Sequence, residues 1–211
     1  MPDPISRAIS EAIVAAWPSF SDPVRAAIAG AAELGVFLAI ALVVAAAWLQ
    51  SRGGDAYEGG AGGDSRHGRD LIDRAISAGR AVIPAGIAVA VAWLAVKGIS
   101  AIVDEQRPFV VLGVAPLFAH VPDSSFPSEH TTLGFALLGA RLRSRAAQMA
   151  IGLVVLVVGV ARVLAGVHWP IDIAAGIVTG VGVAAIIGYA WDRLVPPSRV
   201  GSGGRTPPVV P

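Results

Sequence analysis

The chain has 211 residues, of which 55% are hydrophobic and 15% are charged, and its mean hydropathy is +0.68. A soluble domain carries about 25% charged residues, so this composition excludes an ordinary soluble protein and indicates an integral membrane protein. The net charge of +1 gives no reason to expect nucleic acid as a partner, and the lack of cysteine excludes disulfides and thiolate metal sites.

The apolar pattern predicts an all-α integral membrane helical bundle with about five transmembrane helices and short interfacial helices. A helix that crosses the hydrocarbon layer needs about 20 largely apolar residues. Five stretches meet or approach that length, and together they make residues 1–192 a single membrane domain. These stretches are residues 24–50, 80–103, 127–142, 146–165 and 170–192.

The segments outside these stretches have their own patterns. Asp3 predicts the start of a short helix over residues 4–16, whose apolar residues recur at helical spacing and suit the membrane surface. Residues 65–79 predict a second interfacial helix. Residues 193–211 are rich in proline, glycine and serine, so we expect a disordered cytoplasmic tail.

The positions of the basic residues predict how the bundle is oriented. Eleven of the 16 lysines and arginines fall in the connections on one side of a five-span bundle and in the tail. They are Arg52, Arg66, Arg69, Arg74, Arg80, Arg141, Arg143, Arg145, Arg193, Arg199 and Arg205. Positive charge collects on the cytoplasmic side, so the connection over residues 51–80 is expected in the cytoplasm and the opposite ends of the spans outside.

His168 and Asp172 are the first candidate catalytic pair. They lie four residues apart, with Pro170 between them at an expected helix start, so both side chains share one face. A carboxylate behind an imidazole fixes its tautomer, and an imidazole so held can attack phosphorus as a nucleophile. Two other interpretations stay open: the pair caps and anchors a helix, or it belongs to a metal site, although no third ligand has a characteristic spacing.

Further candidates lie at the same predicted face. Arg107 and Arg162 offer planar donors for phosphoryl oxygens, although each alone equally suits contact with lipid headgroups. The Phe-Pro-Ser-Glu-His segment opens the third stretch, where the free amides of a helix start suit an anion and Ser128 would add its hydroxyl and its amide. His130 is a candidate acid for the leaving oxygen, or else a structural histidine. Glu129 is expected to point away, because its carboxylate would repel phosphate.

These motifs together resemble the type 2 phosphatidic acid phosphatase superfamily. The matching segments are Arg107-Pro108, Pro127-Ser128-Glu129-His130 and Arg162…His168…Asp172. The resemblance implies a phosphatase that needs no metal or other cofactor and forms a phosphohistidine intermediate. It implies that His168 is the nucleophile, Asp172 its orienting partner and His130 the general acid. It assigns phosphate binding to Arg107, Ser128 and Arg162.

The chain departs from the family pattern at two positions. The family lysine precedes the arginine by seven positions, where this chain has Ser100, and Lys97 lies one helical turn earlier as a candidate phosphate contact. The third position of Pro-Ser-x-His is Glu129 instead of the common glycine. That variation and its surroundings are similar to bacterial undecaprenyl-diphosphate phosphatases. His120, in the same stretch, is a candidate diphosphate contact or a loop histidine without function.

The leading hypothesis is therefore a lipid phosphatase that hydrolyses the terminal phosphate of undecaprenyl diphosphate. It would lie in the bacterial cytoplasmic (inner) membrane with its active site facing outward. Alternative substrates are phosphatidate, phosphatidylglycerol phosphate and other prenyl-linked phosphates. A non-enzymatic alternative is a module that binds or transports anionic lipids. The five apolar stretches argue against a soluble haloperoxidase with the same motifs, and the oligomeric state does not follow from the sequence.

Overall fold

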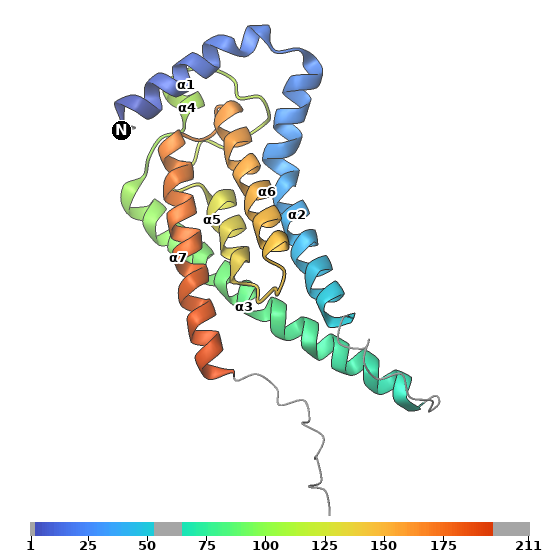
Figure 1. The fold of residues 1–211 in the computed structure, drawn as a ribbon. Helices are drawn as coiled ribbons and strands as arrows, with labels where there is room; N and C mark the ends of the chain where they lie inside the picture. Colours follow the sequence, from blue (N-terminus) through green and yellow to red (C-terminus); the bar gives the residue numbers. More distant parts are fainter. Residues whose placement is uncertain (1–2, 53–64, 196–211) are drawn as a thin grey trace, which may run out of the picture.

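The computed structural model describes residues 3–52 and 65–195. Its helices are α1 (Pro4–Ala16), α2 (Asp22–Arg52), α3 (Ser65–Val103), α4 (Pro108–Val111), α5 (Glu129–Ala136), α6 (Arg145–Leu164) and α7 (Pro170–Leu194) (Figure 1). The 3-10 turns η1 (Trp17–Ser19) and η3 (Leu137–Gly139) extend α1 and α5. The predicted all-α class is confirmed, since the described residues contain helices and no strand.

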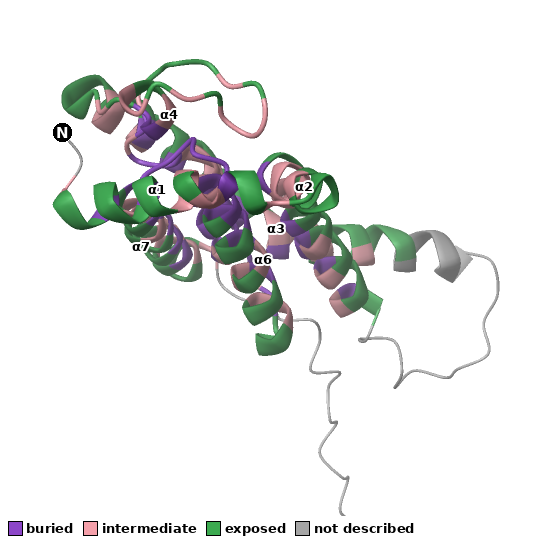
Figure 2. Cartoon of the chain, turned by 90° about the horizontal axis from the view of Figure 1, so that it is seen from above, coloured by how far each residue is buried: buried purple, intermediate pink, exposed green. Residues whose placement is uncertain are grey.

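Long apolar helices build the bundle. Among the described residues, four helices are long and apolar enough to cross a membrane: α2, α3, α6 and α7. Exposed residues cover their outward faces, while buried residues lie where the helices meet (Figure 2). The exposed side chains include Leu34, Phe37, Leu94, Leu153 and Val178. Large apolar side chains on the outside are what a bundle surrounded by lipid requires.

Small residues line the contacts between helices. Lipid tails are as apolar as leucine, so helices in a membrane associate through close packing and not through hydrophobic burial. Gly180 of α7 illustrates the closeness, because a Cβ atom there would lie 2.8 Å from the Phe135 Cβ atom of α5. The buried alanines on α2 and α3 are Ala32, Ala39, Ala47, Ala81, Ala85, Ala88 and Ala92.

The third apolar stretch differs from its prediction. Residues 127–142 were expected as a spanning helix, but α5 and η3 end at Gly139 and the backbone of Ala140 is extended. The helix can be short because α5 contacts all four long helices, so protein surrounds it instead of lipid. The chain nevertheless crosses the bundle. The Ser128 amide donates a hydrogen bond to the Asp172 carbonyl at the start of α7, whereas Arg141 donates one to the Asp192 carboxylate at the end of α7.

The N-terminal helix agrees with its prediction. Asp3 accepts hydrogen bonds from the Ile5 and Ser6 amides at 3.1 and 3.0 Å, and Pro4 is the first helical residue. This arrangement is the expected N-cap followed by proline. In Figure 1, α1 lies across the end of the bundle that also carries α4.

The predicted interfacial helix over residues 65–79 is wrong as a separate element. These residues form the first part of α3, which continues past Pro84 to Val103. Gly79 is the main interruption between the two segments, and a helix tolerates a single glycine. Arg193 and Leu194 of the predicted tail belong to α7, and residues 196–211 lie outside the described residues.

Candidate active site

The candidate residues gather at the end of the bundle beneath α1. They come from the connection between α3 and α5, the start of α5, the last turn of α6 and the start of α7. The buried polar residues of the structure include Arg107, Ser128, Arg162, His168 and Asp172. Burial of polar and charged groups costs free energy unless they form hydrogen bonds or ion pairs, so such a cluster indicates a functional site.

A tight turn connects Arg162 to His168. Gly166 has a φ angle of +76°, a conformation that glycine adopts without strain. A Cβ atom at Gly166 would also lie 2.8 Å from the Trp17 ring, whose Nε1 donates to the Leu164 carbonyl at 2.9 Å. The turn therefore needs glycine both for its backbone and for the close approach of Trp17. It directs His168 back toward the α3–α5 connection.

His168 is held at both ring nitrogens. Its Nε2 atom lies 3.2 Å from Nη1 of Arg107, and its Nδ1 atom lies 3.3 Å from Oδ2 of Asp172. Arginine can only donate, so Nε2 is the acceptor and the ring proton belongs on Nδ1, facing the carboxylate. The same Asp172 oxygen accepts from the Trp169 amide at 2.8 Å. Asp172 thus fixes both the start of α7 and the tautomer of His168.

The environment of His168 keeps its imidazole neutral. Burial lowers the pKa of His168 well below its usual range, and the positive charges of Arg162 and Arg107 lower that pKa further. A neutral imidazole with its proton on Nδ1 carries its lone pair on Nε2, where Arg107 donates to it. An imidazole in this form can act as a nucleophile when that lone pair is turned to a phosphorus atom.

Arg107 links the α3–α5 connection to this pair. Its Nη1 atom donates to the Val167 carbonyl at 2.8 Å, and its Nη2 atom donates to the Ser124 carbonyl at 3.2 Å. Asp123 faces the remaining edge, with its Oδ1 atom 2.9 Å from Nε of Arg107. The guanidinium is buried, while the Asp123 side chain is 61% exposed.

Arg162 lies on another side of the cluster, together with His120. Its Nη1 atom donates to the Ala32 carbonyl at 3.1 Å, and its Nη2 atom lies 3.4 Å from Nε2 of His120. Within the described residues, the buried Nε atom of Arg162 has no acceptor. Burial, followed by the charges of Arg107 and Arg162, lowers the pKa of His120 to about 4. An additional anion at this place would satisfy Nε and would favour protonation of the histidine.

The start of α5 brings Ser128 and His130 to the cluster. Ser128 is the N-cap residue, and its amide is already bonded to the Asp172 carbonyl at 3.1 Å. The amide of Ser128 was expected to bind an anion, but this bond fixes α5 to α7 instead. The Ser128 hydroxyl accepts from Thr131 at 3.0 Å. His130 follows one residue into the helix, within electrostatic reach of Arg162, His120 and Arg107.

A polar cavity opens beside His168. It has a volume of about 240 Å³, and its lining includes Lys97, Arg107, Asp123, Glu129 and His168. Glu129 was expected to point away from the site, and that expectation is wrong. Its Oε2 atom lies 2.8 Å from Nζ of Lys97, so the lysine compensates the carboxylate charge at the cavity.

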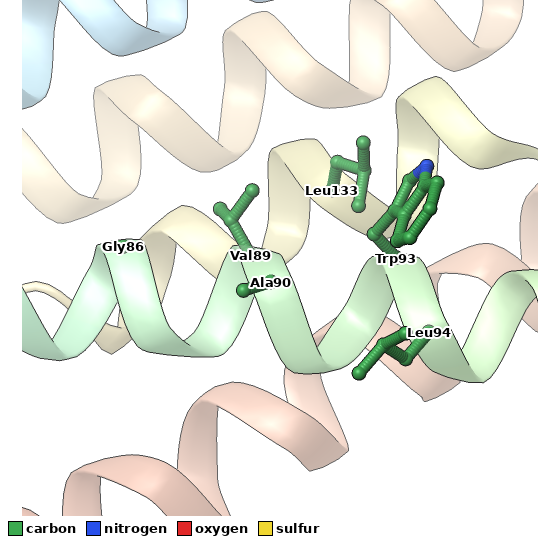
Figure 3. Close-up of a pocket in the computed structure, with 6 residues that line it drawn as sticks. All are labelled: Gly86, Val89, Ala90, Trp93, Leu94 and Leu133. Atoms are coloured by element: carbon green, nitrogen blue, oxygen red, sulfur yellow. The ribbon is translucent and has the colours of Figure 1, made fainter.

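An apolar groove adjoins the polar cavity along α3 and α5. The groove, of about 460 Å³, is lined by Gly86, Val89, Ala90, Trp93, Leu94 and Leu133. Figure 3 shows Val89 and Trp93 of α3 on the side of Leu133 of α5. Lys97 follows Trp93 by one helical turn and lies 5.7 Å from its ring centre, and Glu129 precedes Leu133 by one turn. The ion pair of Lys97 and Glu129 lines the polar cavity and thus lies one helical turn from Trp93 and Leu133 of the groove.

Several residues of this site are not among the candidates that the sequence motifs indicate. Asp123 and Ser124 contact Arg107, Trp169 is fully buried, and the Trp169 ring donates to the Gln106 carbonyl at 2.7 Å. A signal was present for the first two, because an Asp-Ser-Ser run directly before Phe-Pro-Ser-Glu-His is polar where the chain is otherwise apolar. Nothing in the sequence indicates that Asp123 faces Arg107, which lies 16 residues earlier.

The donor set also bears on metal binding. Within residues 3–52 and 65–195, no three histidine, aspartate or glutamate side chains gather as metal ligands. The Nε2 side of His168 faces the guanidinium of Arg107, and guanidinium groups bind anions and repel cations.

These features define an all-α protein with helices of membrane-spanning length and a buried arginine, histidine and aspartate cluster at one end. The model of the PAP2 superfamily matches residues 81–195, which is more than half of the chain. The chain therefore belongs to the PAP2 superfamily, the family that its motifs resemble. All the candidate site residues lie within the matched range.

Individual relatives match shorter parts of the chain. Undecaprenyl-diphosphatase BcrC of Bacillus subtilis (strain 168) is 38% identical over 91 residues, which are 43% of this chain and 45% of the relative. Bacitracin transport permease protein BcrC of Bacillus licheniformis is 34% identical over 116 residues, which are 54% of this chain and 57% of the relative. The chain thus matches about half the length of these curated relatives. No solved structure matches it significantly.

Proposed function

We propose that this protein is a membrane lipid phosphatase that removes the terminal phosphate of undecaprenyl diphosphate. The observation that carries the proposal is the setting of His168, whose Nε2 atom lies 3.2 Å from Arg107 while its Nδ1 atom lies 3.3 Å from Asp172. A buried imidazole held between an anion-binding donor and a carboxylate suits covalent phosphoryl transfer.

The proposed reaction has two steps. In the first, Nε2 of His168 attacks the terminal phosphorus and the bond from phosphorus to the bridging oxygen breaks. His130, whose protonation the charge of the bound phosphate favours, gives its proton to that oxygen. The products are a phosphohistidine and the lipid monophosphate. In the second, water attacks the phosphohistidine, His130 accepts a proton from it, and inorganic phosphate leaves as His168 regains its lone pair.

The charged groups around His168 would stabilise the phosphoryl oxygens during both steps. Arg107 already contacts Nε2 of His168, and the buried Nε atom of Arg162 has no acceptor among the described residues. Guanidinium groups in a buried site bind developing negative charge more strongly than they do in water. The Ser128 hydroxyl and His120 are further candidates for phosphate contacts. Lys97, at the cavity rim, is a candidate for the second phosphate of a diphosphate.

The adjoining surfaces favour a lipid substrate. The groove beside Trp93 and Leu133 is almost entirely apolar, and the ion pair of Lys97 and Glu129 at the polar cavity lies one helical turn away. A prenyl chain in the groove would place its diphosphate at His168. One of the relatives is named an undecaprenyl-diphosphatase, which supports the choice among lipid phosphates.

We further propose an inner-membrane location with the site facing outward. Arg52, Arg145 and Arg193 lie at helix ends opposite to the site, and Arg141 lies in the connection between η3 and α6 at the same end of the bundle. Positive charge marks the cytoplasmic side, so this arrangement supports a site on the outer leaflet. Such a site suits a carrier lipid whose diphosphate is released outside the cell.

The test is phosphate release by the purified full chain from a panel of lipid phosphates. The panel contains undecaprenyl diphosphate, undecaprenyl monophosphate, phosphatidate and phosphatidylglycerol phosphate, each with and without EDTA. We expect the highest kcat/KM with undecaprenyl diphosphate and no loss with EDTA. A higher kcat/KM with another lipid would identify that lipid as the substrate instead. A need for added divalent ions would overturn the metal-independent mechanism.

A second outcome would favour the non-enzymatic alternative. Another relative is named a bacitracin transport permease protein, so binding without hydrolysis is the competing function. Retention of undecaprenyl diphosphate without phosphate release by a folded protein would support that alternative. Proton-transfer groups such as His130 argue against it, because anion binding needs arginines but no acid.

A further inference from the structure

The carboxylate of Asp123 lies where a phosphate oxygen would approach Arg107. Its Oδ1 atom is 2.9 Å from Nε and 2.8 Å from Nη2 of the guanidinium. This edge of a guanidinium is the one that arginine commonly offers to phosphoryl oxygens. Both residues line the polar cavity that contains His168.

Every nitrogen atom of the Arg107 guanidinium already contacts a protein group. Nε and Nη2 face Asp123 and the Ser124 carbonyl, and Nη1 faces the Val167 carbonyl and Nε2 of His168. Four of these contacts are hydrogen bonds, and the ion-pair contact between Nη2 and Asp123 is the fifth. A phosphate that approaches the edge formed by Nε and Nη2 must therefore replace Asp123.

Asp123 is the partner that a ligand can displace most easily. The carbonyls of Ser124 and Val167 are fixed by the backbone, and His168 is buried against Asp172. The Asp123 side chain is 61% exposed and belongs to the long connection between α3 and α5. An exposed carboxylate recovers its hydration when it leaves, so its departure costs little.

We propose that Asp123 is a specificity-determining residue that competes with substrate phosphate for Arg107. A terminal phosphate with two negative charges displaces the carboxylate, whereas a phosphodiester headgroup with one charge does not. Asp123 thereby keeps the bulk anionic lipids of the membrane out of the site. It also keeps the buried Arg107 charge paired, which avoids the cost of an unpaired buried cation. The proposal rests on the proposed function in one respect, that phosphate binds at Arg107.

The test is calorimetric titration of inorganic phosphate into the purified full chain. Asp123→Asn keeps the shape of the side chain and removes its charge, so phosphate should bind about fivefold to tenfold more tightly, as expected for removal of one partly screened competing charge. Asp123→Glu keeps the charge and should stay within about twofold of the parent affinity, since its carboxylate still competes. Asp104→Asn is the matched control, because it removes an exposed charge from the same connection and asparagine suits its φ angle of 42°.

Two further measurements test whether Asp123 acts through Arg107 and whether it excludes phosphodiester lipids. In an Arg107→Lys background, Asp123→Asn should change phosphate affinity less than in the parent, because lysine lacks the fork that both anions use. Phosphatidylglycerol in mixed micelles should compete with phosphate in Asp123→Asn but not in the parent. Thermal unfolding of each variant confirms that it is folded before titration.

The results separate this proposal from the proposed function. Equal or weaker phosphate binding by folded Asp123→Asn would overturn the competition and make Asp123 a residue that positions Arg107. An equal gain in phosphate affinity in Asp104→Asn would also overturn it, because the loss of any negative charge in this connection would then have the same effect. Lack of phosphate binding in every variant would overturn both proposals. Tighter binding by Asp123→Asn without turnover of any lipid would overturn only the proposed function.

Discussion

The imidazole of His168 owes its chemistry to neighbours that its own helix does not supply. Asp172 is four residues away on α7, but Arg107 reaches Nε2 from the connection 61 residues earlier. Together they fix the position and the tautomer of the ring.

His168→Ala should abolish phosphate release, because no other group can form the covalent intermediate. The variant should still fold and bind inorganic phosphate, since the arginines remain. The measurement is turnover of undecaprenyl diphosphate beside calorimetric phosphate binding. Substantial turnover by the folded variant would show that His168 is not the nucleophile.

Asp172→Asn should lower kcat by a factor of about 10² or more, because the amide keeps the side-chain shape but cannot stabilise a positive imidazole. KM should change much less, since Asp172 does not face the polar cavity. Asp192→Asn removes a carboxylate that pairs with Arg141 at the far end of α7 and should leave kcat near the parent value. Equal losses in both variants would indicate a general effect on α7.

The stability of the protein should decrease as the pH falls below 6.5. The folded-state pKa of His168 is lowered by burial, so the unfolded chain binds a proton near pH 6.5 and the folded protein binds it only at lower pH. Protonation therefore favours unfolding by up to about 1.4 kcal/mol per pH unit in this window. His168→Asn should show a smaller fall in Tm between pH 6.5 and 5.0. An identical fall in parent and variant would contradict the prediction.

At the scale of the helices, the site depends on how closely α5 and α7 pack. Gly176 and Gly180 of α7 face the first turns of α5, and a Cβ atom at Gly176 would lie 3.0 Å from the Thr131 Cβ atom. Ser128 bonds Asp172 across the same contact. The candidate acid on α5 and the candidate nucleophile before α7 are therefore held by one helix pair.

Gly180→Val should destabilise the protein by about 1–3 kcal/mol, the usual cost of overpacking, because the new Cβ atom would contact Phe135 and the Thr132 carbonyl. Gly182→Val is the matched control, since a Cβ atom at Gly182 has no neighbour within 4 Å. The measurement is Tm in the same detergent, together with kcat/KM. Equal Tm values for the two variants would contradict the packing seen between α5 and α7.

At the scale of the whole molecule, the two ends of the bundle differ in the polar groups that they carry. The candidate site lies at one end, and Arg141 at the other bonds Gly188 and pairs with Asp192, beside Gln50 at the end of α2. This separation allows the orientation in the membrane to be measured directly.

A cysteine at Val121 should react with a membrane-impermeant thiol reagent in intact cells, and a cysteine at Gly60 should not. Val121 is 63% exposed in the α3–α5 connection, and Gly60 belongs to the connection that carries much of the positive charge. Val121 suits labelling better than its neighbour Asp123, whose side chain contacts Arg107. The parent has no cysteine, so background labelling is absent. Labelling at Gly60 but not at Val121 would invert the proposed orientation.

The amino-acid sequence by itself determined the fold class and the short helix at residues 4–16. It also placed the candidate residues in connections that meet at one end of the bundle. Hydrophobic length and motif spacing are local properties, and each can be seen within about 25 residues. They failed for α5, because the length that a helix needs depends on whether lipid or protein surrounds it.

Only the tertiary structure decided which side chains face one another. The contact of Asp123 with Arg107, the pairing of Lys97 with Glu129 and the use of the Ser128 amide to bond Asp172 all join separate elements. These contacts follow from the close packing of α3, α5 and α7 and from the path of the α3–α5 connection. A sequence pattern records which groups are present, but the partner that satisfies each buried charge is set by distances in three dimensions.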